Sequence, residues 1–315
     1  MGATNIENRG GFSTPLERVD GAVAGPWRSP RQMLAHQEYD GHASIHDSAM
    51  AEKLGFRGAP IEGPTHFTQF EPICAALWGE EWFRTGCLSS HYRSPVVEGE
   101  KVRAFVQPAD DGASADIWMR KEDGTEVLRG SASIGANAPA SALDRRLATL
   151  PAATDLDILA DVKVGMRKPR GRVRMGFAQH MGALYPFSLQ DKLQKATEIT
   201  PWWAPGKAAD GPWKRAIIPF EMVSVLCAYT NRDNPFPVRG KAVGLFADQE
   251  IRMIDGPLFV DEDYEIEQEV VALTQSRRTE SMWVRTNLFR PGGATPVASM
   301  LLNSATLRGS QSAVT

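Results

Sequence analysis

The chain has 315 residues, 42% of them hydrophobic and 23% charged, a globular composition that allows one large domain or two of about 150 residues. The formal net charge of −3 leaves no basic field to attract nucleic acid or an anionic membrane surface. Three cysteines without a CxxC pair disfavour a disulfide framework or a zinc site, and we expect buried thiols. The apolar runs are too short for a membrane span, and the first residues lack a secretory pattern, so we expect a cytoplasmic protein.

The chemistry-bearing residues gather in one N-terminal segment. It places a carboxylic acid, Asp40, and two imidazoles, His42 and His46, within seven residues. Gly63 and Pro64 follow and open an apolar segment of helical period, where glycine lets a ligand approach closely and proline suits the first turn. An acid and an imidazole beside the N–H groups of a helix start are suited to proton transfer next to a carbonyl. Asp40 also suits a turn, and Gly63 an ordinary helix start.

Other residues of this segment have simpler interpretations. Asp47 suits the N-cap of a short helix over residues 48–56. His66, in the first turn of the apolar helix, is more typical of a packed histidine than of a ligand. His42 and His46 have a spacing that aligns two metal ligands on a helix, but Gly41 and Ser44 favour a loop and no third ligand is evident. We therefore expect no metal.

The chain contains two copies of one plan. Each half has an apolar segment of helical period, a strand with an arginine, a turn, a long strand, a Trp-x-Arg strand and a final strand. The matching features of the two halves are residues 67–77 and 218–229, Arg93 and Arg252, and Trp118/Arg120 and Trp283/Arg285. This order predicts a duplicated unit over residues 1–140 and 176–315, with residues 141–175 as a linker. The two sheets could pair edge to edge or pack side by side.

Two features of the chain outside the first segment are ambiguous. A basic run over residues 163–176 predicts a solvated face, and its alternative is contact with an anionic ligand. The second half has no Asp/His motif, and its corresponding region carries Trp202, Trp203 and Trp213 instead. These tryptophans fit either a core or the wall of a substrate tunnel.

Residues 38–106 resemble the hot-dog enoyl-CoA hydratases and dehydratases of the MaoC type, and the whole chain resembles a double hot-dog member of that family. The family's Asp-x-Asn-Pro-x-His, its Gly-Phe and its glycine before the central helix are matched by residues 40–46, Gly55-Phe56 and Ile61-Glu62-Gly63. The resemblance implies an α+β fold of two tandem hot-dog units, each an antiparallel sheet wrapped around a central helix. Only the first unit would be active, and the second would shape the acyl pocket.

The sequence departs from the family at the histidine. His46 lies one residue further from Asp40 than the family's histidine does, so an ungapped match puts Ile45 at that position and His42 at the family's asparagine. Three interpretations are open. The loop bulges and His46 points inward, or His42 supplies the imidazole, or the pair is lost and the pocket binds without turnover.

The resemblance implies hydration or dehydration of an acyl thioester by a hydro-lyase. Asp40 with His46, or with His42, would form the acid-base pair, and Gly63 would donate to the thioester oxygen. The residues expected to contact substrate are Glu62, Thr65, His66, Arg93, Trp202, Trp203 and Trp213. The same fold also supports a thioesterase, with Asp40 or Glu62 activating water, and a non-catalytic acyl-thioester binder.

The resemblance also bears on cofactors and partners. It implies no cofactor. The substrate carrier would be coenzyme A or acyl carrier protein, and the phosphates of coenzyme A would be the anion for the basic run. We expect no nucleic-acid or membrane partner, and the resemblance allows a homodimer.

Overall fold

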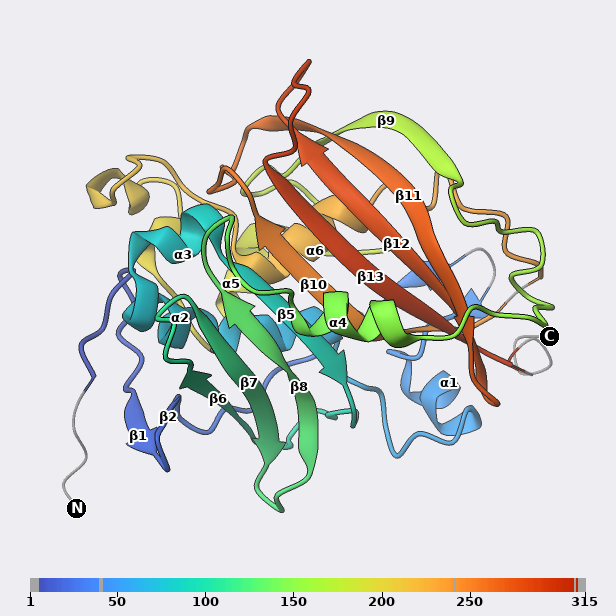
Figure 1. Cartoon of the computed structure of the whole chain (residues 1–315), viewed down its shortest axis with the longest axis horizontal. Helices are drawn as coiled ribbons and strands as arrows, with labels where there is room; N and C mark the ends of the chain where they lie inside the picture. The colour runs from blue at the N-terminus through green and yellow to red at the C-terminus, as the bar shows by residue number, and fades with distance from the viewer. Residues whose placement is uncertain (1–5, 40–41, 241, 309, 311–315) are drawn as a thin grey trace.

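The computed structural model describes residues 6–39, 42–240, 242–308 and 310, and its framework is one antiparallel sheet (Figure 1). In the described part of the chain this sheet has 11 strands in the order β1-β2-β6-β7-β8-β5-β10-β13-β12-β11-β9. The strands of the first half are β1 (Glu17–Val19), β2 (Ala22–Ala24), β5 (Cys87–Tyr92), β6 (Val102–Pro108), β7 (Ser114–Lys121) and β8 (Glu126–Ser133). Those of the second half are β9 (Arg167–Arg174), β10 (Gly244–Met253), β11 (Asp263–Gln275), β12 (Thr279–Phe289) and β13 (Ala298–Leu307). A separate short pair joins β3 (Glu38–Tyr39) to β4 (His42–Ala43).

Helices pack on both faces of the sheet. The α-helices are α1 (Ser48–Lys53), α2 (Glu71–Trp78), α3 (Glu80–Thr85), α4 (Ala142–Thr149), α5 (Leu189–Lys195) and α6 (Phe220–Ala228). The 3-10 helices are η1 (Gly63–Gln69), η2 (Pro201–Trp203) and η3 (Ala208–Asp210). A large antiparallel sheet with packed helices agrees with the predicted α+β class.

The two halves join edge to edge. Strands β5 and β10 pair antiparallel, with Leu88 opposite Ile251. On either side of this junction the strand order is mirrored, because β8, β7 and β6 follow β5 as β13, β12 and β11 follow β10. The mirrored order is what an internal duplication produces, and it selects the edge-to-edge arrangement from the two left open by the sequence. The Trp-x-Arg strands are β7 and β12, which occupy matching places in the two halves.

The central helix of the first half is divided, which the sequence pattern did not predict. Residues from Gly63 form the 3-10 helix η1, and the α-helical part α2 begins only at Glu71. Pro72 lies in the first turn of α2, where its missing N–H needs no partner. A proline that would kink or weaken the interior of one helix therefore stands at the start of a second one. In the second half, α6 is a single α-helix whose residues are all buried.

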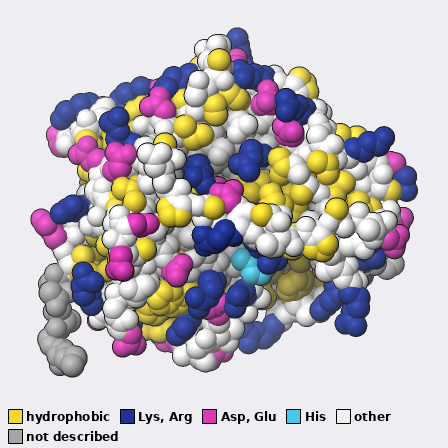
Figure 2. Space-filling model, in the orientation of Figure 1, with side chains coloured by type: hydrophobic (Ala, Val, Ile, Leu, Met, Phe, Trp, Pro, Cys, Tyr) yellow, Lys and Arg dark blue, Asp and Glu magenta, His cyan; other side chains and the backbone are white. Residues whose placement is uncertain are grey.

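The main hydrophobic core lies between the inner face of the sheet and the helices η1, α2 and α6. Helix α4 lies across the opposite face near the β5–β10 junction (Figure 1), where Leu143 packs against Trp283 and Leu301. Figure 2 shows this side of the molecule, on which charged side chains of both signs are interspersed with hydrophobic ones. The three cysteines are free and buried, as expected.

The segment expected to link the halves, residues 141–175, contains regular structure. It includes α4 and also β9, which is the edge strand of the second half. Three arginines of the basic run pair with acidic residues of β11 or the turn before it: Arg167 with Glu269, Arg170 with Glu267 and Arg174 with Asp261. For these arginines the contacts agree with the solvated-face interpretation, whereas Lys168 of the same run is half-buried and donates to Asn231. No helix in the described residues is long and apolar enough to cross a bilayer.

Candidate functional site

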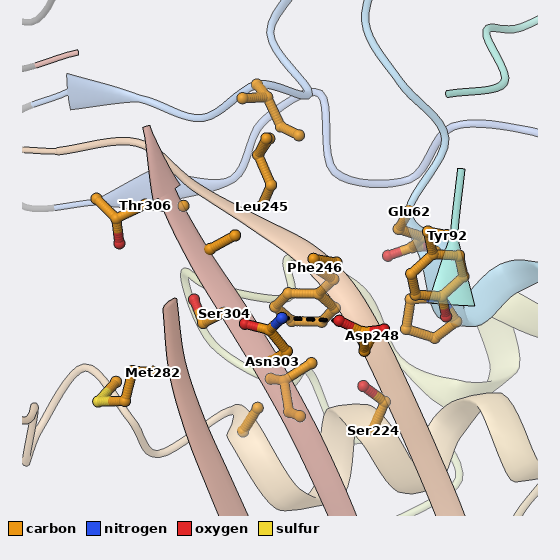
Figure 3. A pocket seen from close by; sticks show the side chains of 18 of the residues that line it. Glu62, Tyr92, Ser224, Leu245, Phe246, Asp248, Met282, Asn303, Ser304 and Thr306 are labelled. Carbon is orange, nitrogen blue, oxygen red and sulfur yellow. Dashed lines mark hydrogen bonds between the residues drawn. The ribbon is translucent and has the colours of Figure 1, made fainter. Parts of the chain in front are cut away.

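A cavity of about 900 Å³ runs from the start of η1 along the inner face of the second half's strands. Figure 3 shows Glu62 and Tyr92 at one end and Met282 and Thr306 toward the other, with Ser224 of α6 beside it. The volume is in the range of a small-molecule site. The first half supplies the polar end, and the second half supplies most of the remaining wall.

Gly63 is required by a close approach to an aromatic ring. A Cβ atom at this position would lie 2.6 Å from Cζ of Tyr92. The hydroxyl of Tyr92 donates to Oε1 of Gln249 at 3.0 Å, and Nε2 of Gln249 donates to Ser224 at 2.7 Å. This chain of bonds crosses the junction of the halves and holds the ring against Gly63. Gly63 begins η1 and lines the cavity, and its role as an oxyanion donor stays a prediction.

His46 is half-buried on the cavity wall, and one of its ring nitrogens is already hydrogen-bonded. Its Nδ1 lies 2.7 Å from the carbonyl oxygen of Pro60. A carbonyl only accepts, so Nδ1 carries the hydrogen and Nε2 of the neutral ring is a proton acceptor. Burial lowers the pKa of His46 below 6.5, although the Pro60 carbonyl and Glu62 oppose this. Ile45 is also buried and lines the same cavity, so the loop places both residues there.

Glu62 is locked in a buried ion pair with the second half. Lys192 of α5 donates from Nζ to Oε1 of Glu62 at 2.6 Å and to Oγ1 of Thr65 at 2.7 Å. Thr65 in turn donates to Oε1 of Glu62 at 3.0 Å. Burial opposes the charge, but Lys192 holds the pKa of Glu62 below its usual value. Glu62 and Thr65 were both expected to contact substrate. Both line the cavity, and each already has polar partners.

His66 and Arg93 also line the cavity, in different environments. His66 is buried, and burial lowers its pKa to about 4, so the ring is neutral. Its Nδ1 has no hydrogen-bond partner in the described part of the chain. Arg93 is half exposed and pairs with Glu126 at 2.8 Å.

The acid of the predicted pair, Asp40, lies outside the described residues. His42 is described only in its backbone, where it pairs with Tyr39 in the short β3–β4 ladder. The Asp40/His46 and Asp40/His42 pairs therefore stay predictions. Asp47 accepts from the N–H of Met50 at 2.8 Å, which confirms it as the N-cap of α1.

The three tryptophans lie in a different part of the molecule. Trp203 is fully buried with its ring 5.4 Å from that of Phe12, and Trp202 and Trp213 both pack edge-on against Phe83. None of the three lines the cavity in the described structure. They join the second half to α3 of the first, so the core interpretation fits and the tunnel-wall interpretation does not.

Two cavity residues, Lys192 and Glu221, were not predicted from the sequence. Glu221 lies in the first turn of α6 and is buried. A lone acid inside an apolar helical segment is a signal that could have identified it, since unpaired acids are rarely buried. Lys192 gave no such signal, because its helix has the polar pattern of a surface element.

Comparison with solved structures supports the fold. The chain is similar to a putative MaoC domain protein dehydratase from Chloroflexus aurantiacus J-10-fl, with a TM-score of 0.58, 13% identity, and coverage of 92% of this chain and 95% of that one. It is also similar to a conserved hypothetical protein from Mycobacterium tuberculosis described as a double hotdog fold, with a TM-score of 0.53, 12% identity, and coverage of 89% and 94%. The resemblance predicted from the sequence is thus confirmed at the level of fold. No family model and no curated relative matches the chain.

Proposed function

We propose that the chain adds water to, or removes it from, an acyl thioester carried by coenzyme A or acyl carrier protein. The observation that carries this proposal is the state of His46. Burial lowers its pKa, so the ring is neutral at pH 7, and the Nδ1–H bond to Pro60 leaves Nε2 as the basic nitrogen on the cavity wall. A fixed neutral imidazole is a general base, as hydration requires.

The remaining residues suit the same reaction. In hydration, His46 takes a proton from water while the oxygen bonds to the β-carbon of an α,β-unsaturated thioester. Negative charge then develops on the thioester oxygen, and we assign its stabilisation to the N–H of Gly63, which begins η1. The α-carbon takes a proton from an acid, and the sequence offers Asp40 as the partner of His46.

Two alternative functions, a thioesterase and a non-catalytic binder, predict different outcomes. A thioesterase needs a carboxylate free to activate water, whereas Glu62 is already bound by Lys192 and Thr65. A non-catalytic binder would gain thermal stability from an acyl thioester without changing it.

The test uses trans-2-butenoyl-CoA and longer enoyl thioesters on both carriers, following enoyl absorbance and free thiol. Wild-type protein should consume the enoyl group without releasing thiol. His46→Asn retains a donor for the Pro60 carbonyl but has no base, and it should lower kcat by about 10²–10⁴-fold. His180→Asn is the matched control, because His180 is exposed and outside the cavity lining.

Three outcomes would contradict the proposal. Thiol release by the wild type would indicate a thioesterase. Ligand-induced stabilisation without turnover would indicate a binder. Full activity in His46→Asn, with loss in His42→Ala, would move the base to His42.

A further inference from the structure

The first turn of α6 carries a buried carboxyl group that the proposed mechanism does not use. Glu221 is only 2% exposed, and it lines the cavity. Neither of its carboxyl oxygens makes a hydrogen bond among the residues that the structure describes, and its ion pair with Lys192 is long, at 3.4 Å. Buried polar groups are nearly always bonded, so an exception facing a cavity indicates a partner that arrives with the ligand.

Charged and titratable groups surround Glu221 from several elements. Nζ of Lys192, on α5, lies 3.4 Å from Oε2 of Glu221. Glu62 faces it from the residue before η1, and Glu71 faces it from α2. Burial raises the pKa of Glu221 to about 7, although Lys192 opposes the increase. Near neutral pH this carboxyl therefore exists in both protonation states.

The other acidic residues near the cavity are less suited to transfer a proton. Glu62 is ionised and held by Lys192 and Thr65. Glu71 is fully buried, does not line the cavity, and accepts from the N–H of Phe220. Asp248 also lines the cavity, but it accepts from Asn303 at 2.7 Å and pairs with Arg146 at 2.9 Å. Glu221 combines a raised pKa, a place on the cavity wall and carboxyl oxygens without a hydrogen-bond partner among the described residues.

We propose that Glu221, from the second half of the chain, is the acid that protonates the α-carbon of the thioester during hydration. The inference rests on the proposed function, and it assigns to Glu221 the role that the sequence gives to Asp40. It also gives the second half a part in the chemistry, where the sequence resemblance predicted only a pocket wall.

The proton transfers balance as follows in the hydration direction. His46 accepts a proton from water, and the water oxygen forms a bond to the β-carbon. The π electrons of the double bond move to the α-carbon, which forms a C–H bond with the proton of Glu221. The protein is left with an imidazolium at His46 and a carboxylate at Glu221 beside Lys192, and transfer of one proton from the first to the second restores it.

The test compares Glu221→Gln with Glu71→Gln on trans-2-butenoyl-CoA and enoyl-acyl carrier protein. Glutamine keeps the shape of a protonated carboxyl but transfers no proton. Glu221→Gln should lower kcat by about 10²–10⁴-fold with little change in KM. Glu71→Gln, the matched buried carboxyl outside the cavity, should retain wild-type kcat. Glu221→Asp keeps a carboxyl group and should recover part of the lost kcat. This variant also tests the inference if Glu221→Gln fails to fold.

A pH profile separates an acid from a purely structural residue. Hydration needs Glu221 protonated, so wild-type kcat should fall as the pH rises through about 7, and this limb should be lost in the residual activity of Glu221→Gln. Equal kcat in Glu221→Gln and Glu71→Gln overturns the inference, as does a loss confined to Asp40→Asn. Wild-type inactivity on every enoyl thioester overturns the proposed function as well, so the two failures are distinct.

Discussion

The close approach of Gly63 to Tyr92 predicts a stability change whose sign depends on a second residue. A Cβ at Gly63 would lie 2.6 Å from Cζ and 2.9 Å from Cε2 of Tyr92, well inside van der Waals contact. The ring cannot move away without breaking the 3.0 Å bond from Tyr92 to Gln249. Overpacking of this kind costs about 1–3 kcal/mol, and loss of the hydrogen bond adds about 1 kcal/mol. Gly63→Ala should therefore destabilise the protein by about 2–4 kcal/mol.

Removal of the ring should reverse the effect. In a Tyr92→Ala background the clash disappears, and Gly63 is not at positive φ. Alanine then restricts the unfolded chain, so Gly63→Ala should be neutral or stabilising by up to about 1 kcal/mol. Gly58→Ala is the control, because its nearest neighbour, Cγ1 of Val97, is at 3.5 Å, an ordinary contact; it should change stability by less than about 0.5 kcal/mol.

Urea unfolding followed by far-UV circular dichroism measures all of these variants. The double-mutant cycle over Gly63 and Tyr92 should give a coupling energy of about 2 kcal/mol or more. Equal destabilisation by Gly63→Ala in both backgrounds would refute the steric argument. A neutral effect in the wild-type background would do so too, and it would remove the reason for a glycine at the proposed oxyanion site.

Three further predictions concern buried groups. Lys192→Met leaves Glu62 and Glu221 without their shared cation and should lower the free energy of unfolding by about 3–5 kcal/mol at pH 8. At pH 5 carboxyls protonate more readily, so the loss should be smaller there. An equal loss at both pH values would count against the ion pair. The pKa of Glu221 rises from 4.5 to about 7 on folding, so wild-type stability relative to Glu221→Gln should be highest below pH 4.5 and fall by about 3 kcal/mol by pH 7. If the urea midpoints of the wild type and of Glu221→Gln change in parallel with pH, this prediction is wrong. Trp203→Ala should lower the free energy of unfolding by about 3–5 kcal/mol without changing the preferred acyl chain length. A changed preference would indicate that Trp203 lines the substrate pocket.

Local patterns were sufficient for much of the fold. Alternating and helical periods predicted the strands and the two apolar helices, because burial of one face leaves a period in the sequence. The pattern was insufficient at Pro72, where it indicated a kink or a lost hydrogen bond within one central helix, while the structure has a 3-10 helix followed by α2. Proline is tolerated near a helix start and excluded from its interior, so the same residue is compatible with both until packing is known.

The candidate site was predicted in part. His46, Gly63, Glu62, Thr65, His66 and Arg93 are brought to one cavity. All lie in the first half, within or near one segment whose residue types and spacing already indicated proton transfer. The tryptophans were ambiguous because the same aromatic residues fill a core or line a tunnel, and their contacts with Phe12 and Phe83 place them in the core.

The sequence by itself determined the two repeated halves, the strand–turn–strand plan of each and the segment that carries His46 and Gly63, since each depends on residues close in the chain. Only the tertiary structure decided that the halves share one sheet through β5 and β10. It also decided that Lys192 pairs with Glu62 across 130 residues of sequence and that Glu221 lines the same cavity as His46 and Gly63. A buried charge takes its protonation state from neighbours in space, and no local pattern records those neighbours.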